Sequence, residues 1–224
     1  NVPACVVTPG STEQIQAIIR ICNRYKVPFN PLTNGQMFAA AMAPGTVTIY
    51  FKRMNKILNI DEENMNITVQ AFVDYMQINA EANKRGLWNG VNPLACSITE
   101  LASQFNFAGI WQSDLKYAGL SRNVVSVTIV LPTGEIMKTG SAALAGGKTF
   151  WEYTPGPDLV GILRTGMGTC GIVTEVTVKL HPWLGGPTMP EDIGRPYIQD
   201  YPNMDFDRPP TPKGYRHYDI EFID

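Results

Sequence analysis

The chain has few histidines and cysteines, the side chains that most often form zinc sites and nucleophile–base pairs. Its 224 residues include two histidines, His181 and His217, and neither stands next to a Ser or Cys nucleophile. The four cysteines form no C-x-x-C pair, lie near no histidine and lack the dense spacing of a disulfide framework. They are Cys5, Cys22, Cys96 and Cys170. Zinc motifs and disulfide-rich scaffolds need such spacings. We therefore expect no metal site, no self-contained hydrolase site and reduced cysteines.

Long apolar runs and an excess of positive charge are also missing. The longest apolar stretches, such as residues 124–131, have the length of a strand, whereas a membrane-spanning helix needs about 20 residues. Eighteen basic and twenty acidic residues give a net charge of −2 without any basic run, which argues against nucleic acid as a partner. The sequence begins at Asn1 without a basic and apolar leader, so we expect a cytoplasmic protein.

What the chain does contain is enough apolar and aromatic residues for a folded core. Ser11 and Gln14 form the capping pattern S-x-x-Q, and the isoleucines that follow recur at helical spacing, which predicts a helix over residues 12–25. We expect further helices over residues 72–85, 98–104 and 158–164. Strands are expected at residues 3–8, 46–51, 66–71, 124–131, 136–139 and 172–180, and residues 26–29 lead into another strand that ends at the loop of residues 31–35.

This order of elements predicts an α+β fold of two subdomains. A small βαββ subdomain would precede a larger antiparallel sheet flanked by helices, with the seam between them in residues 52–65. Residues 1–183 would form this domain. Residues 184–217 are rich in Pro, Gly and Asp, which favours an extended linker, and residues 218–224 alternate like the start of a strand in a missing domain.

Two nucleotide-binding patterns occur in the wrong context. Residues 166–171 match G-x-G-x-x-G, but a helix precedes them and a strand follows, which reverses the order of a Rossmann site. Residues 147–149 read Gly-Lys-Thr, yet Ala142 occupies the position where a P-loop requires its first glycine. We discard both readings.

Several spaced segments together resemble one family. Residues 6–15 and 27–31, the segment Met54-Asn55-Lys56-Ile57, the segment Val130–Ile136 and the run from Phe150 to Pro182 occur in the same order and spacing in that family. Over residues 3–183 the chain is similar to the FAD-binding (PCMH-type) domain of the vanillyl-alcohol oxidase and p-cresol methylhydroxylase flavoproteins. The resemblance implies FAD as cofactor.

The resemblance also implies three cofactor-binding segments. Backbone N–H groups in a tight loop can neutralise a pyrophosphate without Lys or Arg, and Asn-Gly tolerates the positive φ that such a loop needs. The candidate residues are Pro31, Leu32, Thr33, Asn34, Gly35 and Gln36 in the first loop, Pro93, Ser97, Ile98 and Thr99 in the second, and Gly168, Gly171, Ile172 and Val173 in the third. Alternative interpretations stay open for each: an ordinary turn between strands, the N-cap of a following helix, and a sharp turn into a strand.

The chain departs from the family pattern at three places, one of which is Val69-Gln70-Ala71-Phe72, a segment that lacks the family's glycine. The first loop contains no histidine, and Cys96 and Cys170 are near but not at the position expected for a cysteinyl link, so we expect non-covalent FAD. Glu100 stands where relatives carry a glycine. Its carboxylate would either repel the pyrophosphate or stabilise the first turn of a helix.

The implied function is that of the FAD-binding part of a flavin-dependent oxidoreductase. Its substrate would be an alcohol, a 2-hydroxy acid or a 4-hydroxybenzylic compound, bound by a missing C-terminal domain or another subunit of an oligomer. No catalytic residue can be named in this chain. The alternative is a flavin-less structural or interaction subunit.

Overall fold

The computed structural model describes residues 2–35, 44–90, 98–99, 114–154, 156–164, 166 and 168–183. All of them lie in one compact unit, Asn1–Pro187. The second unit, Thr188–Asp224, lies outside the described residues, and so do the expected linker and terminal strand, residues 184–217 and 218–224.

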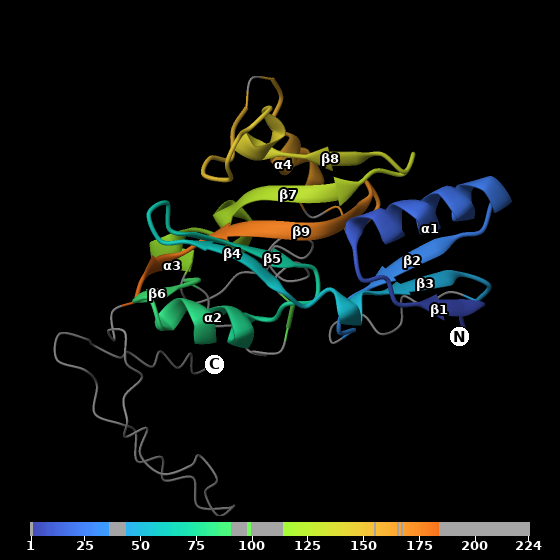
Figure 1. Ribbon diagram of the computed structural model, residues 1–224, viewed down its shortest axis with the longest axis horizontal. Coiled ribbons are helices and arrows are strands. Elements are labelled where there is room, and N and C mark those ends of the chain that lie inside the picture. The colour runs from blue at the N-terminus through green and yellow to red at the C-terminus, as the bar shows by residue number, and fades with distance from the viewer. Residues whose placement is uncertain are drawn as a thin grey trace, which may run out of the picture. The chain divides into compact units, whose positions relative to one another are not determined.

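A small parallel sheet forms the N-terminal part of this unit (Figure 1). Its strands are β1 (Cys5–Val7), β2 (Phe29–Leu32) and β3 (Val47–Tyr50), in the order β1-β3-β2. Both strand pairs are parallel. Parallel neighbours need a crossover rather than a hairpin, so β1 reaches β2 through helix α1 (Thr12–Tyr25).

Helix α1 begins where the sequence predicts it. The hydroxyl of Ser11 accepts a hydrogen bond from the backbone N–H of Gln14 at 3.3 Å, while the Gln14 side chain accepts from Gly10 N at 2.7 Å. Its buried face consists of Thr12, Ile15, Ile19 and Cys22. On another face, Gln16 Nε2 donates to Gly134 O and Asn23 Nδ2 donates to Pro132 O, both at 2.6 Å. These bonds tie α1 to a turn of the second sheet.

The second sheet has five antiparallel strands in the order β4-β5-β9-β7-β8 (Figure 1). They are β4 (Ile57–Asp61), β5 (Asn66–Gln70), β7 (Val124–Val130), β8 (Ile136–Lys138) and β9 (Ile172–Lys179). Every residue of β7 is buried, and the strand lies between β9 and β8. A tight turn over residues 132–135 joins β7 to β8, with Leu131 N donating to Glu135 O at 2.8 Å.

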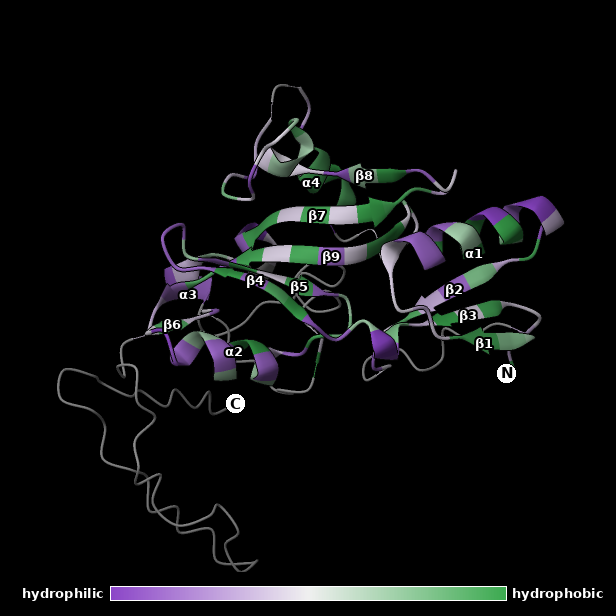
Figure 2. Ribbon diagram, viewed as in Figure 1, coloured by the Kyte–Doolittle hydropathy of each residue, from purple (hydrophilic) through white to green (hydrophobic). Residues whose placement is uncertain are grey.

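One face of this sheet is apolar and the other is polar. On β9, Ile172, Val176 and Val178 belong to the main hydrophobic core. Because side chains alternate along a strand, Glu175 and Thr177 point to the opposite face. Figure 2 shows the same mixture as pale and purple bands between green segments of β7 and β9.

Short elements complete the unit. Helix α2 (Tyr75–Asn83) follows β5, and the two-residue strands β6 (Leu87–Trp88) and β10 (His181–Pro182) pair antiparallel. The remaining helices are α3 (Asp114–Tyr117), α4 (Leu159–Leu163) and the 3-10 turns η2 (Phe51–Arg53), η4 (Leu120–Asn123) and η5 (Gly140–Ala143). No helix in the described ranges has the length and apolar character of a membrane span.

The α+β fold is therefore confirmed, with three local corrections. The helix expected over residues 72–85 begins only at Tyr75, because Asp74 is extended and caps it together with Gln77. Strand β4 was not predicted. Within the helix expected at residues 98–104, Thr99 forms a β-bridge with Asp74, and the residues after Thr99 lie outside the described part.

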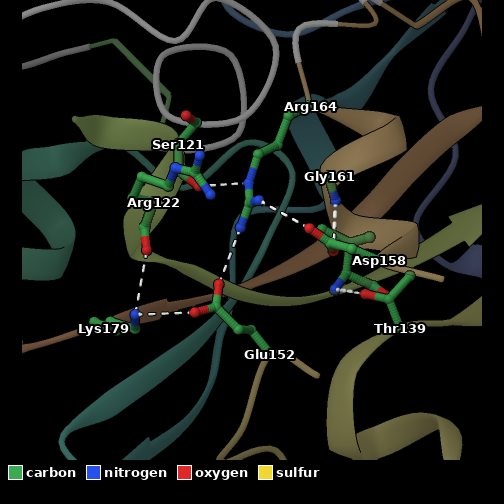
Figure 3. Close-up of polar contacts among 9 residues, drawn as sticks. Ser121, Arg122, Thr139, Glu152, Asp158, Gly161, Arg164 and Lys179 are labelled. Carbon is green, nitrogen blue, oxygen red and sulfur yellow. Dashed lines mark hydrogen bonds and ion pairs between the residues drawn. The ribbon is translucent and has the colours of Figure 1, made fainter. Parts of the chain in front are cut away.

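A buried ionic cluster holds the segment around α4 against the sheet (Figure 3). The Arg164 guanidinium donates to Ser121 O at 2.8 Å and to Glu152 Oε2 at 3.1 Å. It also lies 3.5 Å from Asp158 Oδ2, while Lys179 Nζ lies 3.6 Å from Glu152 Oε1. Only 9% of the Arg164 side chain and 14% of the Glu152 side chain are exposed. The cluster thus joins β9, η4 and the 152–164 segment.

Candidate FAD-binding site

The first predicted loop follows β2 directly. Pro31 and Leu32 are the last residues of the strand and are paired with Ile49 and Tyr50 of β3. Thr33, Asn34 and Gly35 continue half-buried, and Gly35 has a φ of +70°. Since β2 and β3 are parallel, the connection between them cannot be a tight hairpin. Gln36 lies outside the described residues.

The third predicted segment is a turn that leads into β9. Thr169 N donates to Gly166 O at 2.8 Å, and Gly168 and Gly171 have φ values of +82° and +139°. A Cβ on Gly171 would lie 2.7 Å from Val130 O, so only glycine fits there. Ile172 and Val173 then begin the strand and are buried.

The first and third segments lie against each other. A Cβ built on Gly168 would lie 3.2 Å from Pro31 Cγ. These two residues are far apart in the chain, so the fold alone brings the glycine turn to the end of β2. This arrangement places the backbone of the glycine turn against the ring of Pro31.

The second predicted segment is described only in part. Ile98 and Thr99 are 5% and 1% exposed and lie beside the start of α2, where Tyr75 N donates to Ile98 O at 3.3 Å. Thr99 Oγ1 is buried and has no hydrogen-bond partner among the residues that the structure describes. Pro93, Ser97 and Glu100 lie outside them.

Residues 71–74 connect all three segments. Ala71 N donates to Thr174 O at 3.0 Å, beside the third segment, and Asp74 pairs with Thr99 of the second. The ring of Phe72 meets the ring of Tyr50 edge-on at 5.6 Å, and Tyr50 is the strand partner of Leu32. The described parts of the predicted loops therefore gather around one short stretch after β5. No cofactor role was predicted for this stretch, because it lacks the glycine expected from the family pattern and carries no other local signal.

The residues present fit a dinucleotide. A buried hydroxyl without a partner is costly, and a phosphate or ribose oxygen would satisfy Thr99 Oγ1. The glycines at positive φ permit a ligand to approach the backbone closely. In the described part of the chain, no group of three His, Cys, Asp or Glu side chains could hold a metal ion.

His181 belongs to a separate aromatic cluster. Its ring lies on the ring of Tyr117 with centroids 4.1 Å apart, and its Nε2 is 3.3 Å from Asn123 Oδ1. Trp88 contacts both Tyr117 and Trp183 edge-on. Burial lowers the pKa of His181, and the charges of Lys179 and Lys116 lower it further. These contacts give His181 a packing role.

Comparison with known proteins defines the class. The model of the FAD binding domain family matches residues 3–140. The chain is 33% identical to the glycolate oxidase subunit GlcD of Bacillus subtilis over 184 residues, which cover 81% of this chain and 38% of that protein. It is 32% identical to a D-lactate dehydrogenase of Anaerostipes hadrus, covering 80% of this chain and 37% of that protein.

Solved structures agree with this result. A 4-ethylphenol oxidase from Gulosibacter chungangensis superposes with a TM-score of 0.70 at 27% identity, covering 79% of this chain and 34% of that one. A p-cresol methylhydroxylase gives a TM-score of 0.69 at 25% identity, covering 81% of this chain and 36% of that one. The fold and the site define an FAD-binding module of the PCMH type. The chain belongs to the FAD binding domain family, and it spans little more than a third of the length of the relatives it matches.

Proposed function

We propose that this chain is the FAD-binding part of an oxidoreductase that acts on a small 2-hydroxy acid. The juxtaposition of Pro31 and Gly168 supports the proposal, since it brings together two of the segments predicted to bind the cofactor. The names of the relatives, a glycolate oxidase subunit and several D-lactate dehydrogenases, favour a 2-hydroxy acid over the benzylic alternatives.

Each segment has a distinct task in this proposal. Backbone N–H groups of residues 33–35 would bind the pyrophosphate, and Thr99 Oγ1 would donate to an oxygen of the cofactor. Gly168 and Gly171 would keep side chains out of the space that the cofactor needs. When bound, FAD supplies the hydride acceptor, and the protein contributes position and electrostatics.

Substrate binding and proton transfer would come from residues outside this chain. His181, the histidine that the structure describes, packs on Tyr117 and lies in none of the predicted cofactor loops. We propose a non-covalent cofactor for that reason, and a substrate domain or subunit that completes the enzyme. An oligomeric state and a cytoplasmic location stay predictions from the sequence.

Spectroscopy tests the proposal. The purified protein should be yellow or take up added FAD with a change in the flavin absorbance, and acid precipitation should release all the flavin. A colourless protein that binds no added FAD would instead favour the structural subunit. With the complete protein, anaerobic D-lactate or glycolate should bleach the flavin, whereas 4-ethylphenol should not.

A further inference from the structure

A groove crosses the polar face of the five-stranded sheet and contains none of the predicted cofactor residues. It encloses about 220 Å³ and is lined by Asn59, Thr68, Ser126, Thr128, Lys138, Ala142, Thr149, Glu175 and Thr177. The floor lies on the face of β9 opposite to Thr174, whose hydroxyl contacts Thr12 of α1. The groove is therefore separate from the junction of Pro31 and Gly168.

Strand register places the lining side chains in two rows. Thr177 of β9 lies between its partners Thr68 and Ser126, and Asn59 is opposite Thr68. In the second row, Thr128 lies between Glu175 and Lys138. Side chains at paired positions share one face of the sheet, so both rows point into the groove.

These polar groups are unusually well buried. Thr177, Ser126 and Thr128 are 2%, 5% and 9% exposed. Thr68 and Thr177 share a hydroxyl hydrogen bond of 2.9 Å, and Thr128 donates to Glu175 Oε2 at 2.9 Å. A hydroxyl has one donor and two acceptor sites, so each can still bind a ligand. The two rows of lining side chains thus offer hydrogen-bond donors and acceptors side by side.

The two charged side chains that line the groove have opposite signs, so the groove favours neither an anion nor a cation. Glu175 and Lys138 supply one negative and one positive group, which leaves the lining without net charge. The volume corresponds to about seven water molecules, which is below the range of sites for drug-sized ligands. A small neutral molecule with several hydroxyl groups fits both properties.

Two exposed aromatic residues follow a lining residue of the groove in the chain. Phe150 and Trp151 directly follow the lining residue Thr149 and are 55% and 56% exposed. Their backbone is fixed, because Ser141 Oγ accepts from both amide groups at 3.1 Å. Trp151 also meets Tyr153 edge-on at 5.6 Å. Exposed aromatic faces pack well against the C–H face of a sugar ring.

We propose that this groove, together with the exposed ring of Trp151 beyond its lining, forms a second binding site for a neutral sugar or polyol of monosaccharide size. The site is independent of FAD. Cross-strand hydroxyls would exchange hydrogen bonds with the ligand, and Trp151 would cover its apolar face.

The test uses methyl α-D-glucopyranoside and saturation-transfer NMR on the 224-residue chain, with and without FAD. We expect saturable binding in the millimolar range, equal in both conditions. Thr177→Val should weaken it roughly tenfold, because one neutral hydrogen bond is lost. Trp151→Ala should also weaken it, and this exposed position keeps the test valid if Thr177→Val fails to fold.

Two substitutions serve as controls. Thr133→Val removes a hydroxyl in the β7–β8 turn, and Tyr25→Ala removes an aromatic ring that is 66% exposed on α1. Neither should change the binding. Absence of saturable binding overturns the proposal, and so does equal binding by all variants. Binding of D-lactate in place of the glucoside would overturn the neutral ligand class.

Discussion

Gly168 approaches Pro31 so closely that a methyl group on the glycine would be in tight contact with the proline ring, at 3.2 Å. This contact joins the glycine turn before β9 to the end of β2. If FAD binds at this junction, small changes there should affect the cofactor more than they affect the fold.

Replacement of Gly168 by alanine should weaken FAD binding. The new Cβ presses on Pro31 and displaces the first loop, and we expect a loss of roughly tenfold in affinity, or about 1.4 kcal/mol. Gly86→Ala is the matched control, because Gly86 also has a positive φ, +69°, yet its Cβ would meet nothing within 4 Å. Both variants should lose about 1 kcal/mol of stability from the left-handed backbone. FAD titration and urea unfolding separate the two effects, and equal affinities would refute a role for the junction.

Removal of the Thr99 hydroxyl should have opposite effects on the free and bound protein. Thr99 Oγ1 lacks a partner among the described residues, so Thr99→Val should leave the FAD-free protein as stable or more stable. FAD affinity should fall, since the cofactor loses a donor.

Thr174→Val provides the contrast. Thr174 is fully buried, accepts from Thr12 Oγ1 and donates to Thr128 O. Its loss should destabilise the FAD-free protein by about 1 kcal/mol. Thermal unfolding with and without FAD measures both variants, and a destabilised FAD-free Thr99→Val protein would contradict the interpretation.

Bound FAD should protect Cys170 from thiol reagents. Cys170 is exposed in the turn beside Gly168, and Cys5 is exposed in β1. The rate of alkylation at Cys170 should fall with the fraction of protein that has bound FAD, while the rate at Cys5 stays constant. Mass spectrometry of the two peptides measures both rates in one sample. An unprotected Cys170 in the saturated protein would place the cofactor elsewhere.

Acid should destabilise the fold through His181. Its pKa is lower in the folded protein than its ordinary value of 6.5, so the unfolded chain binds the proton more tightly. Stability is therefore constant above about pH 6.5, falls as the pH decreases, and levels off below the folded pKa. Urea unfolding between about pH 5.5 and 7.5 should show this slope. The slope should disappear in His181→Gln, and its persistence would assign it to another group.

The buried pair of Arg164 and Glu152 should contribute far more than an exposed pair. Glu152→Ala leaves the Arg164 charge with less compensation, and we expect a loss of roughly 3 kcal/mol. Glu81→Ala removes the partner of Lys84 and Arg85 on the surface of α2 and should cost much less. Denaturant unfolding compares the two, and similar losses would show that burial does not strengthen the cluster.

Local sequence patterns predicted the elements that have strong local causes. Helix α1 combines a capping serine with isoleucines at helical spacing, and the β7–β8 hairpin has Gly134 at a φ of +85°. Strand β4 was missed because its pairing slips between Ile57 and Asn59, which breaks the alternation of apolar residues. The start of α2 was misplaced because the cap at Asp74 overrides the apolar residues that precede it.

The site could be predicted only as separate pieces. Pro31–Gly35 and Gly168–Gly171 each have the composition of a turn, and nothing local indicates that they touch. Their contact depends on β3 lying between β1 and β2 and on β9 lying between β5 and β7. Such pairings depend on the whole core, so only the resemblance to a family or the structure itself could show them.

The central position of β9 has a consequence for folding during synthesis. Strands β5 and β7 both pair with β9, so neither can complete its hydrogen bonds until the ribosome has delivered Lys179. The all-buried strand β7 would meanwhile expose a row of valines and isoleucine, with only the short β8 as a partner. Contacts between distant segments form slowly, and unpaired apolar strands aggregate easily. The nascent chain therefore has a period of vulnerability that ends only when β9 arrives.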